Sequence, residues 1–151
     1  MVPEILVDAD GCPVKQEIYR VAGRHGIKVL VVANSRMRAP QSDLIEIVLV
    51  GGRFDAADDW IAQRVRANDI VVTADIPLAA RCLPLGARVL DHRGGVFTEE
   101  SIGGAMASRE LMSHLRDMGS LTGGPAAFQD RDRSRFLHRL DETIVACLRV
   151  K

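Results

Sequence analysis

The sequence predicts an α/β fold, a three-layer domain in which helices cover both faces of a mostly parallel sheet of about five strands. Short, nearly continuous apolar segments such as 2–7, 27–33 and 70–73 predict buried strands. The segments between them carry apolar residues at helical spacing instead. At 151 residues, the chain has the length expected of a single domain that spans 1–151.

The first half of the chain is expected to alternate strand and helix. Pro13 suits the first turn of a helix, where its missing N–H is not needed, and Gly26 is a typical stop signal. A polar loop at 34–43 separates the second strand from the third. Strands are expected at 4–8, 27–33 and 45–50, and helices at 13–25 and 54–66.

The second half continues this alternation and then changes to longer helices. Thr98 is a plausible N-cap, and Gly119 a plausible end, for one of them. Strands are expected at 69–73 and 87–90, and helices at 75–83, at 99–118 and from 132 or 134 to about 148. A loop at 122–125 precedes the last helix.

The composition limits the classes of protein that fit. A formal net charge of zero argues against a protein that coats nucleic acid through bulk positive charge, but it permits a local basic groove. Three widely spaced cysteines without a Cys-x-x-Cys pair predict a reducing, cytoplasmic compartment. The first apolar run is too short for a signal peptide or a membrane helix, so no membrane partner is expected. Nothing in the composition indicates an oligomeric state.

Acidic residues follow two of the predicted strands. Asp8 and Asp10 end the first strand, and Asp75 follows the fourth. The carboxyl ends of parallel strands share one edge of a sheet, so these side chains are expected to converge there. Grouped carboxylates repel one another, and a hard divalent cation relieves that repulsion. The alternative is structural, because Asp10-Gly11 is a common turn pair and Asp75 can cap a helix.

Two further acids, Asp58 and Asp59, open the helix expected after the third strand. The N-terminus of this helix falls on the same edge, so one of them is a candidate for the metal site. Asp55 is a natural N-cap, and acids in a first helical turn also favour the helix dipole without any ligand. The two side chains are about 100° apart on a helix, so the sequence leaves open which of them faces the site.

Basic residues supply candidate phosphate contacts. Arg36 and Arg38 lie in the loop after the second strand, and Arg131, Arg133 and Arg135 follow the loop at 122–125. Arginine binds phosphate through paired hydrogen bonds. The alternative for the second group is a self-neutralised helix start, in which neighbouring aspartates cap the helix.

The segments 7–15, 54–61, 69–80 and 123–136 together resemble an uncharacterised bacterial family, the YaiI/YqxD proteins, over nearly the whole chain. The resemblance implies a fold similar to PIN-like domains, which are metal-dependent nucleases. In that wider group, acids follow the first strand, open a central helix and follow the fourth strand, and the acids of this chain match those places.

These observations predict a PIN-like nuclease that depends on Mg²⁺ or Mn²⁺ and acts on RNA or single-stranded nucleic acid. Asp8, Asp10 and Asp75 are the predicted catalytic residues. The predicted metal ligands are Asp8, Asp10, Asp58, Asp59 and Asp75, and the predicted phosphate contacts are Lys15, Arg36, Arg38, Arg131, Arg133 and Arg135. Two alternatives stay open: a phosphatase with an aspartyl nucleophile, and a non-catalytic module that binds nucleic acid or another partner.

Overall fold

The structure is a computed structural model that describes residues 2–53, 55–119 and 126–150. Over these residues the sheet has six strands in the order β3-β2-β1-β4-β5-β6. The strands are β1 (Ile5–Asp8), β2 (Val29–Ala33), β3 (Ile45–Leu49), β4 (Ile70–Val72), β5 (Arg88–Leu90) and β6 (Val96–Phe97). β1 to β5 pair in parallel, and β6 is antiparallel to β5.

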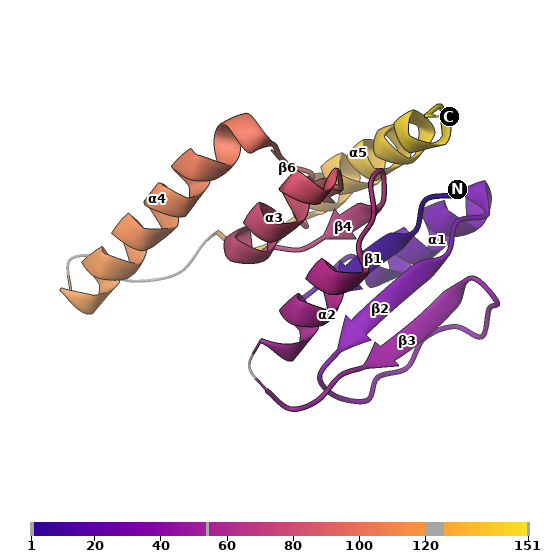
Figure 1. The fold of residues 1–151 in the computed structure, drawn as a ribbon, viewed down its shortest axis with the longest axis horizontal. Helices are drawn as coiled ribbons and strands as arrows, with labels where there is room; N and C mark the ends of the chain where they lie inside the picture. Colours follow the sequence, from indigo (N-terminus) through magenta and orange to yellow (C-terminus); the bar gives the residue numbers. More distant parts are fainter. Residues whose placement is uncertain (1, 54, 120–125, 151) are drawn as a thin grey trace.

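Helices cover both faces of this sheet (Figure 1). The helices of the described chain are α1 (Lys15–His25), α2 (Ala56–Arg64), α3 (Ile76–Cys82), α4 (Glu99–Asp117) and α5 (Asp130–Leu148), with a 3-10 turn η1 at Leu83–Leu85. Side chains alternate along each strand. Ile5 and Val7 therefore pack towards α1 and α5, while Leu6 packs towards α2 and α3. The predicted three-layer α/β fold is confirmed.

β1 is the central strand of the fold. It is hydrogen-bonded to β2 on one side and to β4 on the other, and its residues Ile5 to Val7 are completely buried. A strand with no polar face is stable only between two neighbours and under two helical layers. The apolar run at the start of the sequence therefore fixes β1 in the middle of the sheet.

The structure differs from the sequence-based expectation at several boundaries. The sixth strand, β6, was not predicted, because two residues are too short to show a period. A tight turn brings it back to β5: Gly94 has φ +87°, and a Cβ on Gly95 would lie 2.5 Å from an Asp91 oxygen. The expected helix start at Phe54 and the expected loop at 122–125 lie outside the described residues.

The last helix starts earlier than predicted. α5 begins at Asp130 because Gln129 and Asp132 form a reciprocal capping box. Thr98 does cap α4, as predicted, by accepting a hydrogen bond from the Ser101 N–H at 3.1 Å. α4 contacts α3 and extends outward from the sheet in Figure 1. No helix in the described part of the chain is long and apolar enough to cross a membrane.

Ion pairs close the amino-terminal edge of the sheet. Glu4 Oε1, just before β1, accepts hydrogen bonds from Arg64 at 2.7 Å and from Arg66 at 2.8 Å. Asp69, just before β4, is 1% exposed and accepts from the backbone N–H groups of Glu4 and Arg66, each at 2.9 Å. The carboxylates at this edge are therefore fully engaged in holding β1 against β4.

We expect Asp69→Ala to lower the free energy of unfolding by about 3 kcal/mol. The substitution leaves the backbone N–H groups of Glu4 and Arg66 without their acceptor, and it removes the buried carboxylate that pairs with the Arg66 side chain. Urea denaturation measures the change. Asp43→Ala, at an exposed loop position, is the matched control and should change stability by less than about 0.5 kcal/mol. Equal effects of the two substitutions would contradict a structural role for Asp69.

Candidate metal centre

Four carboxylates line one cavity at the carboxyl edge of the sheet. Asp8 is the last residue of β1, and Asp75 lies between β4 and α3. β1 and β4 are parallel neighbours, so these two residues lie at adjacent strand ends. Asp10, in the turn after β1, and Asp58, on α2, complete the acidic lining of the cavity, whose volume is about 220 Å³. We refer to this cavity as the acidic cleft.

Thr73 joins the two strand ends beneath the acidic cleft. Its hydroxyl donates to Asp8 Oδ2 at 2.9 Å and accepts from the backbone N–H of Asp75 at 2.9 Å. Asp75 Oδ1 in turn accepts from the Leu78 N–H at 3.0 Å and caps α3. The capping alternative for Asp75 therefore describes one of its contacts, while the same residue also lines the cleft.

Burial and mutual repulsion raise the pKa values of two cleft carboxyls. Burial is the largest cause for Asp8, with smaller contributions from Asp75 and Asp10, and the hydrogen bond from Thr73 opposes the rise in its pKa. Burial also raises the pKa of Asp58 to about 6, helped by the charges of Asp75 and Asp8. Among the described residues, none of the four cleft carboxylates forms a salt bridge. The cleft thus concentrates negative charge, and the charge of Arg81 opposes the rise in the pKa of Asp58 only in part.

Asp59 lies in a different environment from Asp58. Its carboxylate oxygens pair with Arg53 at 3.1 Å and with Arg81 at 2.9 Å. It lines a separate hollow next to Trp60 and does not line the acidic cleft. The position of α2 on the sheet therefore brings Asp58 into the cleft and leaves Asp59 neutralised by arginines outside it.

The residues of the acidic cleft fit a hard divalent cation in type and charge. Carboxylate oxygens, with the side-chain amide of Asn34 beside them, are the ligands that Mg²⁺ and Mn²⁺ prefer. Within residues 2–53, 55–119 and 126–150, however, no three His, Cys, Asp or Glu side chains are grouped closely enough to hold an ion as they stand. The carboxylates surround a shared space, and ion binding would require them to move inward.

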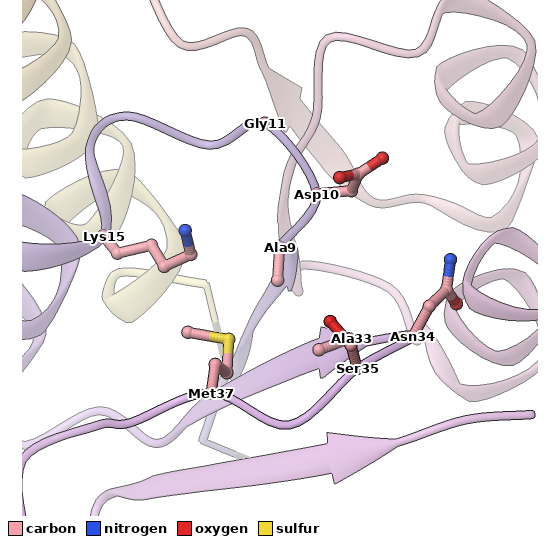
Figure 2. A pocket seen from close by; sticks show the side chains of 8 residues that line it. All are labelled: Ala9, Asp10, Gly11, Lys15, Ala33, Asn34, Ser35 and Met37. Atoms are coloured by element: carbon pink, nitrogen blue, oxygen red, sulfur yellow. The ribbon is translucent and has the colours of Figure 1, made fainter.

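A second cavity, of about 260 Å³, adjoins the acidic cleft and shares Asp10 and Asn34 with it. Figure 2 shows Lys15 and Met37 on one side of this cavity and the Asp10 and Asn34 side chains on the other. Ser35 also contributes to the lining. We refer to this cavity as the lysine pocket.

The lysine pocket places positive charge beside the acidic cleft. Lys15 Nζ donates to the Cys12 carbonyl oxygen at 3.0 Å, which holds the amine near the turn after β1. Arg36 and Arg38 follow Ser35 in the same loop and are exposed. Among the residues that the structure describes, neither arginine forms a salt bridge. Both are therefore accessible to an anion.

The three predicted phosphate contacts on α5 fall into two kinds. Arg131 and Arg135 are exposed. Arg133 pairs with Glu17, a buried residue of α1, and its guanidinium lies 5.1 Å from the centre of the Phe128 ring. The charge of Arg133 is already balanced within the protein, so its geometry supports a structural contact between α1 and α5.

Sequence analysis missed three polar residues of this region. Asn34 and Ser35 follow β2, so their position after a buried strand was a usable signal. Thr73 gave no such signal, because a threonine at the end of an apolar run is common in strands. Its contacts with Asp8 and Asp75 appear only when the strands are paired.

Known proteins similar to this chain have names that state no activity. A family model described as "Uncharacterized BCR, YaiI/YqxD family" matches residues 6–146. A "UPF0178 protein" of Rhodopseudomonas palustris (strain HaA2) is 60% identical over 140 residues, which cover 93% of this chain and 85% of the relative. A "UPF0178 protein" of Sphingopyxis alaskensis is 59% identical over 144 residues, which cover 95% and 94%. No solved structure gives a significant match.

The raised pKa of Asp58 predicts a specific pH dependence of stability in metal-free buffer with EDTA. The folded protein holds this proton more tightly than the unfolded chain, so the stabilisation is present below the unfolded value of 3.8 and is lost as the pH rises through about 6. We therefore expect Asp58→Asn to be more stable than the wild type at about pH 7.5, by roughly 1 kcal/mol after allowing for solvent screening. The difference should shrink towards about pH 4.

Urea denaturation at both pH values tests this expectation. Asp59→Asn is the matched control, because it removes one carboxylate from the same helical turn but breaks pairs with Arg53 and Arg81. It should not stabilise the protein at either pH. If Asp58→Asn destabilises the protein equally at both pH values, the electrostatic description of the acidic cleft is wrong.

Proposed function

This chain belongs to the uncharacterised YaiI/YqxD family, and we propose, from the chemistry of its acidic residues and from the PIN-like fold that the resemblance implies, that it is a phosphodiesterase that uses Mg²⁺ or Mn²⁺ to cleave RNA or single-stranded nucleic acid. The observation that carries the proposal is the set of four carboxylates, Asp8, Asp10, Asp58 and Asp75, around one cavity, none of which forms a salt bridge with another described residue. Such an arrangement destabilises the folded protein, and a bound cation would offset that cost.

Asp8 and Asp75 are the proposed direct ligands, and Asp10 and Asp58 would bind directly or through water. When bound, one or two such ions would hold the scissile phosphate, lower the pKa of the attacking water and neutralise the leaving oxygen. Thr73 would orient one carboxylate oxygen of Asp8 through its 2.9 Å hydrogen bond. The cap on α3 would fix Asp75 in the same way.

The substrate class follows from the charge next to the acidic cleft. A nucleic-acid strand carries one phosphate per nucleotide, and Lys15 lies beside the cleft with Arg36 and Arg38 beyond it. These cations would hold the phosphates that flank the one in the acidic cleft. A single strand suits the site better than a duplex, because its backbone can bend into the two adjoining cavities of about 220 and 260 Å³.

The phosphatase alternative predicts a different reaction intermediate. An aspartyl nucleophile would form a phosphoryl-aspartate at Asp8, whereas a metal-dependent phosphodiesterase forms no covalent intermediate. Mass spectrometry after acid quenching with a small phosphoryl donor separates the two. A stable phosphoryl group on Asp8 would favour the phosphatase.

For the metal, we expect saturating Mn²⁺ to raise the melting temperature by roughly 5–10 °C, through preferential binding to the folded state. The double variant Asp8→Asn/Asp75→Asn should lose this rise and also lose Mn²⁺-dependent cleavage of single-stranded RNA. Differential scanning fluorimetry and gel electrophoresis of labelled RNA measure the two effects. Asp43→Asn, on an exposed loop residue, should keep both. An unchanged Mn²⁺ response in the double variant would refute the metal site.

For the substrate, we expect Arg36→Gln/Arg38→Gln to lower the salt slope of RNA binding by about 0.7 for each phosphate that the protein no longer neutralises. Binding is measured in EDTA across a salt series by fluorescence anisotropy, so that no cleavage interferes. Arg24→Gln is the control, because this exposed arginine lies near the C-terminal end of α1. Arg131→Gln/Arg135→Gln tests the exposed part of α5 in the same assay. A slope unaffected by every arginine variant would remove the basic groove from the proposal.

A further inference from the structure

A third cavity lies on the side of the acidic cleft towards β5. Its volume is about 440 Å³, and its lining is mostly apolar. Phe97 of β6 and Phe128, just before α5, supply its aromatic walls, with His92 and Arg93 from the turn after β5. We refer to this cavity as the aromatic pocket.

The aromatic pocket is continuous with the site already described. It shares Ala74 with the acidic cleft and Gly11 with the lysine pocket. Ala74 is the chain neighbour of Asp75, and Gly11 is the chain neighbour of Asp10. A ligand whose phosphate occupies the acidic cleft therefore has an adjacent cavity of a different, apolar character for another of its groups.

His92 supplies a polar group without a partner in this apolar setting. The residue is 9% exposed, and among the described residues its Nε2 is buried and has no hydrogen-bond partner. Burial lowers the pKa of His92, so the imidazole is neutral at pH 7 and can donate or accept according to its tautomer. The outer torsion of a histidine is broad, so a small tilt can turn the nitrogen towards a ligand.

The walls of the aromatic pocket are held in place by other contacts. Asp91 Oδ1 accepts hydrogen bonds from the backbone N–H groups of Arg93 and Gly95, each at 2.8 Å, and fixes the turn that carries His92. Arg93 pairs with Asp132 at 3.0 Å and lies 5.9 Å from the centre of the Phe128 ring. These contacts hold the turn after β5 and the Arg93 side chain in place without a ligand.

We propose that the aromatic pocket is a subsite for a nucleobase of the strand whose phosphate occupies the acidic cleft, with the base held against the aromatic walls and its edge read by His92. Planar bases stack on aromatic rings and on arginine, and their edges need hydrogen-bond partners. The inference rests on the proposed function, because it assigns the base of the same substrate.

A nucleobase accounts for the pocket better than an aliphatic ligand does. An aliphatic group would fill the space between Phe97 and Phe128 but would leave the His92 nitrogen buried and unpaired, which is costly. A base edge offers both donors and acceptors and suits either tautomer of His92. A phosphate alone would gain nothing from the apolar walls.

The test compares ligands with and without a base in the presence of Mg²⁺, because without a cation the carboxylates of the acidic cleft would repel a phosphate. The probes are uridine and adenosine 5′-monophosphate, with ribose 5-phosphate as the base-free control. NMR follows the imidazole signal of His92 and the backbone amide of Gly11, which gives a dissociation constant in each variant. We expect the nucleotides to shift the His92 signal and to bind at least roughly 5-fold more tightly than ribose 5-phosphate.

Substitutions test whether the tighter binding of nucleotides depends on the aromatic pocket. Phe128→Leu should weaken nucleotide binding by roughly 5- to 100-fold and leave ribose 5-phosphate unchanged. Phe97→Leu is a second variant with the same expectation, in case Phe128→Leu does not fold. His92→Phe should also weaken only the nucleotides, whereas His138→Phe, at an exposed position of α5, should change nothing. Circular dichroism checks the fold of each variant.

The inference is overturned if ribose 5-phosphate binds as tightly as the nucleotides, if no probe binds, or if the aromatic and His92 variants have no selective effect. Because nucleoside monophosphates contain no phosphodiester bond, their binding is measured independently of the proposed cleavage. Base-dependent binding without Mn²⁺-dependent cleavage would refute the phosphodiesterase and keep the subsite. Mn²⁺-dependent cleavage without base-dependent binding would support the phosphodiesterase and refute the subsite.

Discussion

The parallel pairing of β1 between β2 and β4 is the constraint on which the rest of the structure depends. It places the carboxyl ends of β1 and β4 side by side, so that Asp8 and Thr73, 65 positions apart in the sequence, share a hydrogen bond. The N-terminus of α2 reaches the same edge with Asp58. The hydrophobic burial of the strands keeps these acids together despite their repulsion.

The acidic residues at the two edges of the sheet differ in how their charges are balanced. At the amino-terminal edge, Glu4 is matched by Arg64 and Arg66, and the buried Asp69 accepts backbone hydrogen bonds. At the carboxyl edge, the acids of the acidic cleft remain close together, and the pKa of Asp58 rises to about 6. The acids of the amino-terminal edge are neutralised, whereas none of those in the acidic cleft forms a salt bridge with a described residue. Such a local loss of stability is typical of a functional site.

The three cavities along the carboxyl edge form a series with distinct chemistry. The lysine pocket has Lys15 opposite Asp10, the acidic cleft carries four carboxylates, and the aromatic pocket is mostly apolar. They share lining residues, so one extended ligand can contact all of them. A nucleotide strand has the matching sequence of groups, with a charged phosphate between a planar base and the next phosphate. The proposed activity and the proposed base subsite therefore rest on neighbouring but separate surfaces.

The sequence by itself determined the fold class and the strand-end acids, because periodicity and turn residues act over a few positions. It did not reveal β6, since two residues show no period, and only the packing of α2 decided that Asp58 and not Asp59 enters the acidic cleft. The pairing of Arg133 with Glu17 spans 116 positions, and His92 lines one pocket with aromatic side chains from β6 and from the segment before α5. Such long-range contacts form only when the whole chain has packed, so local sequence patterns do not predict them.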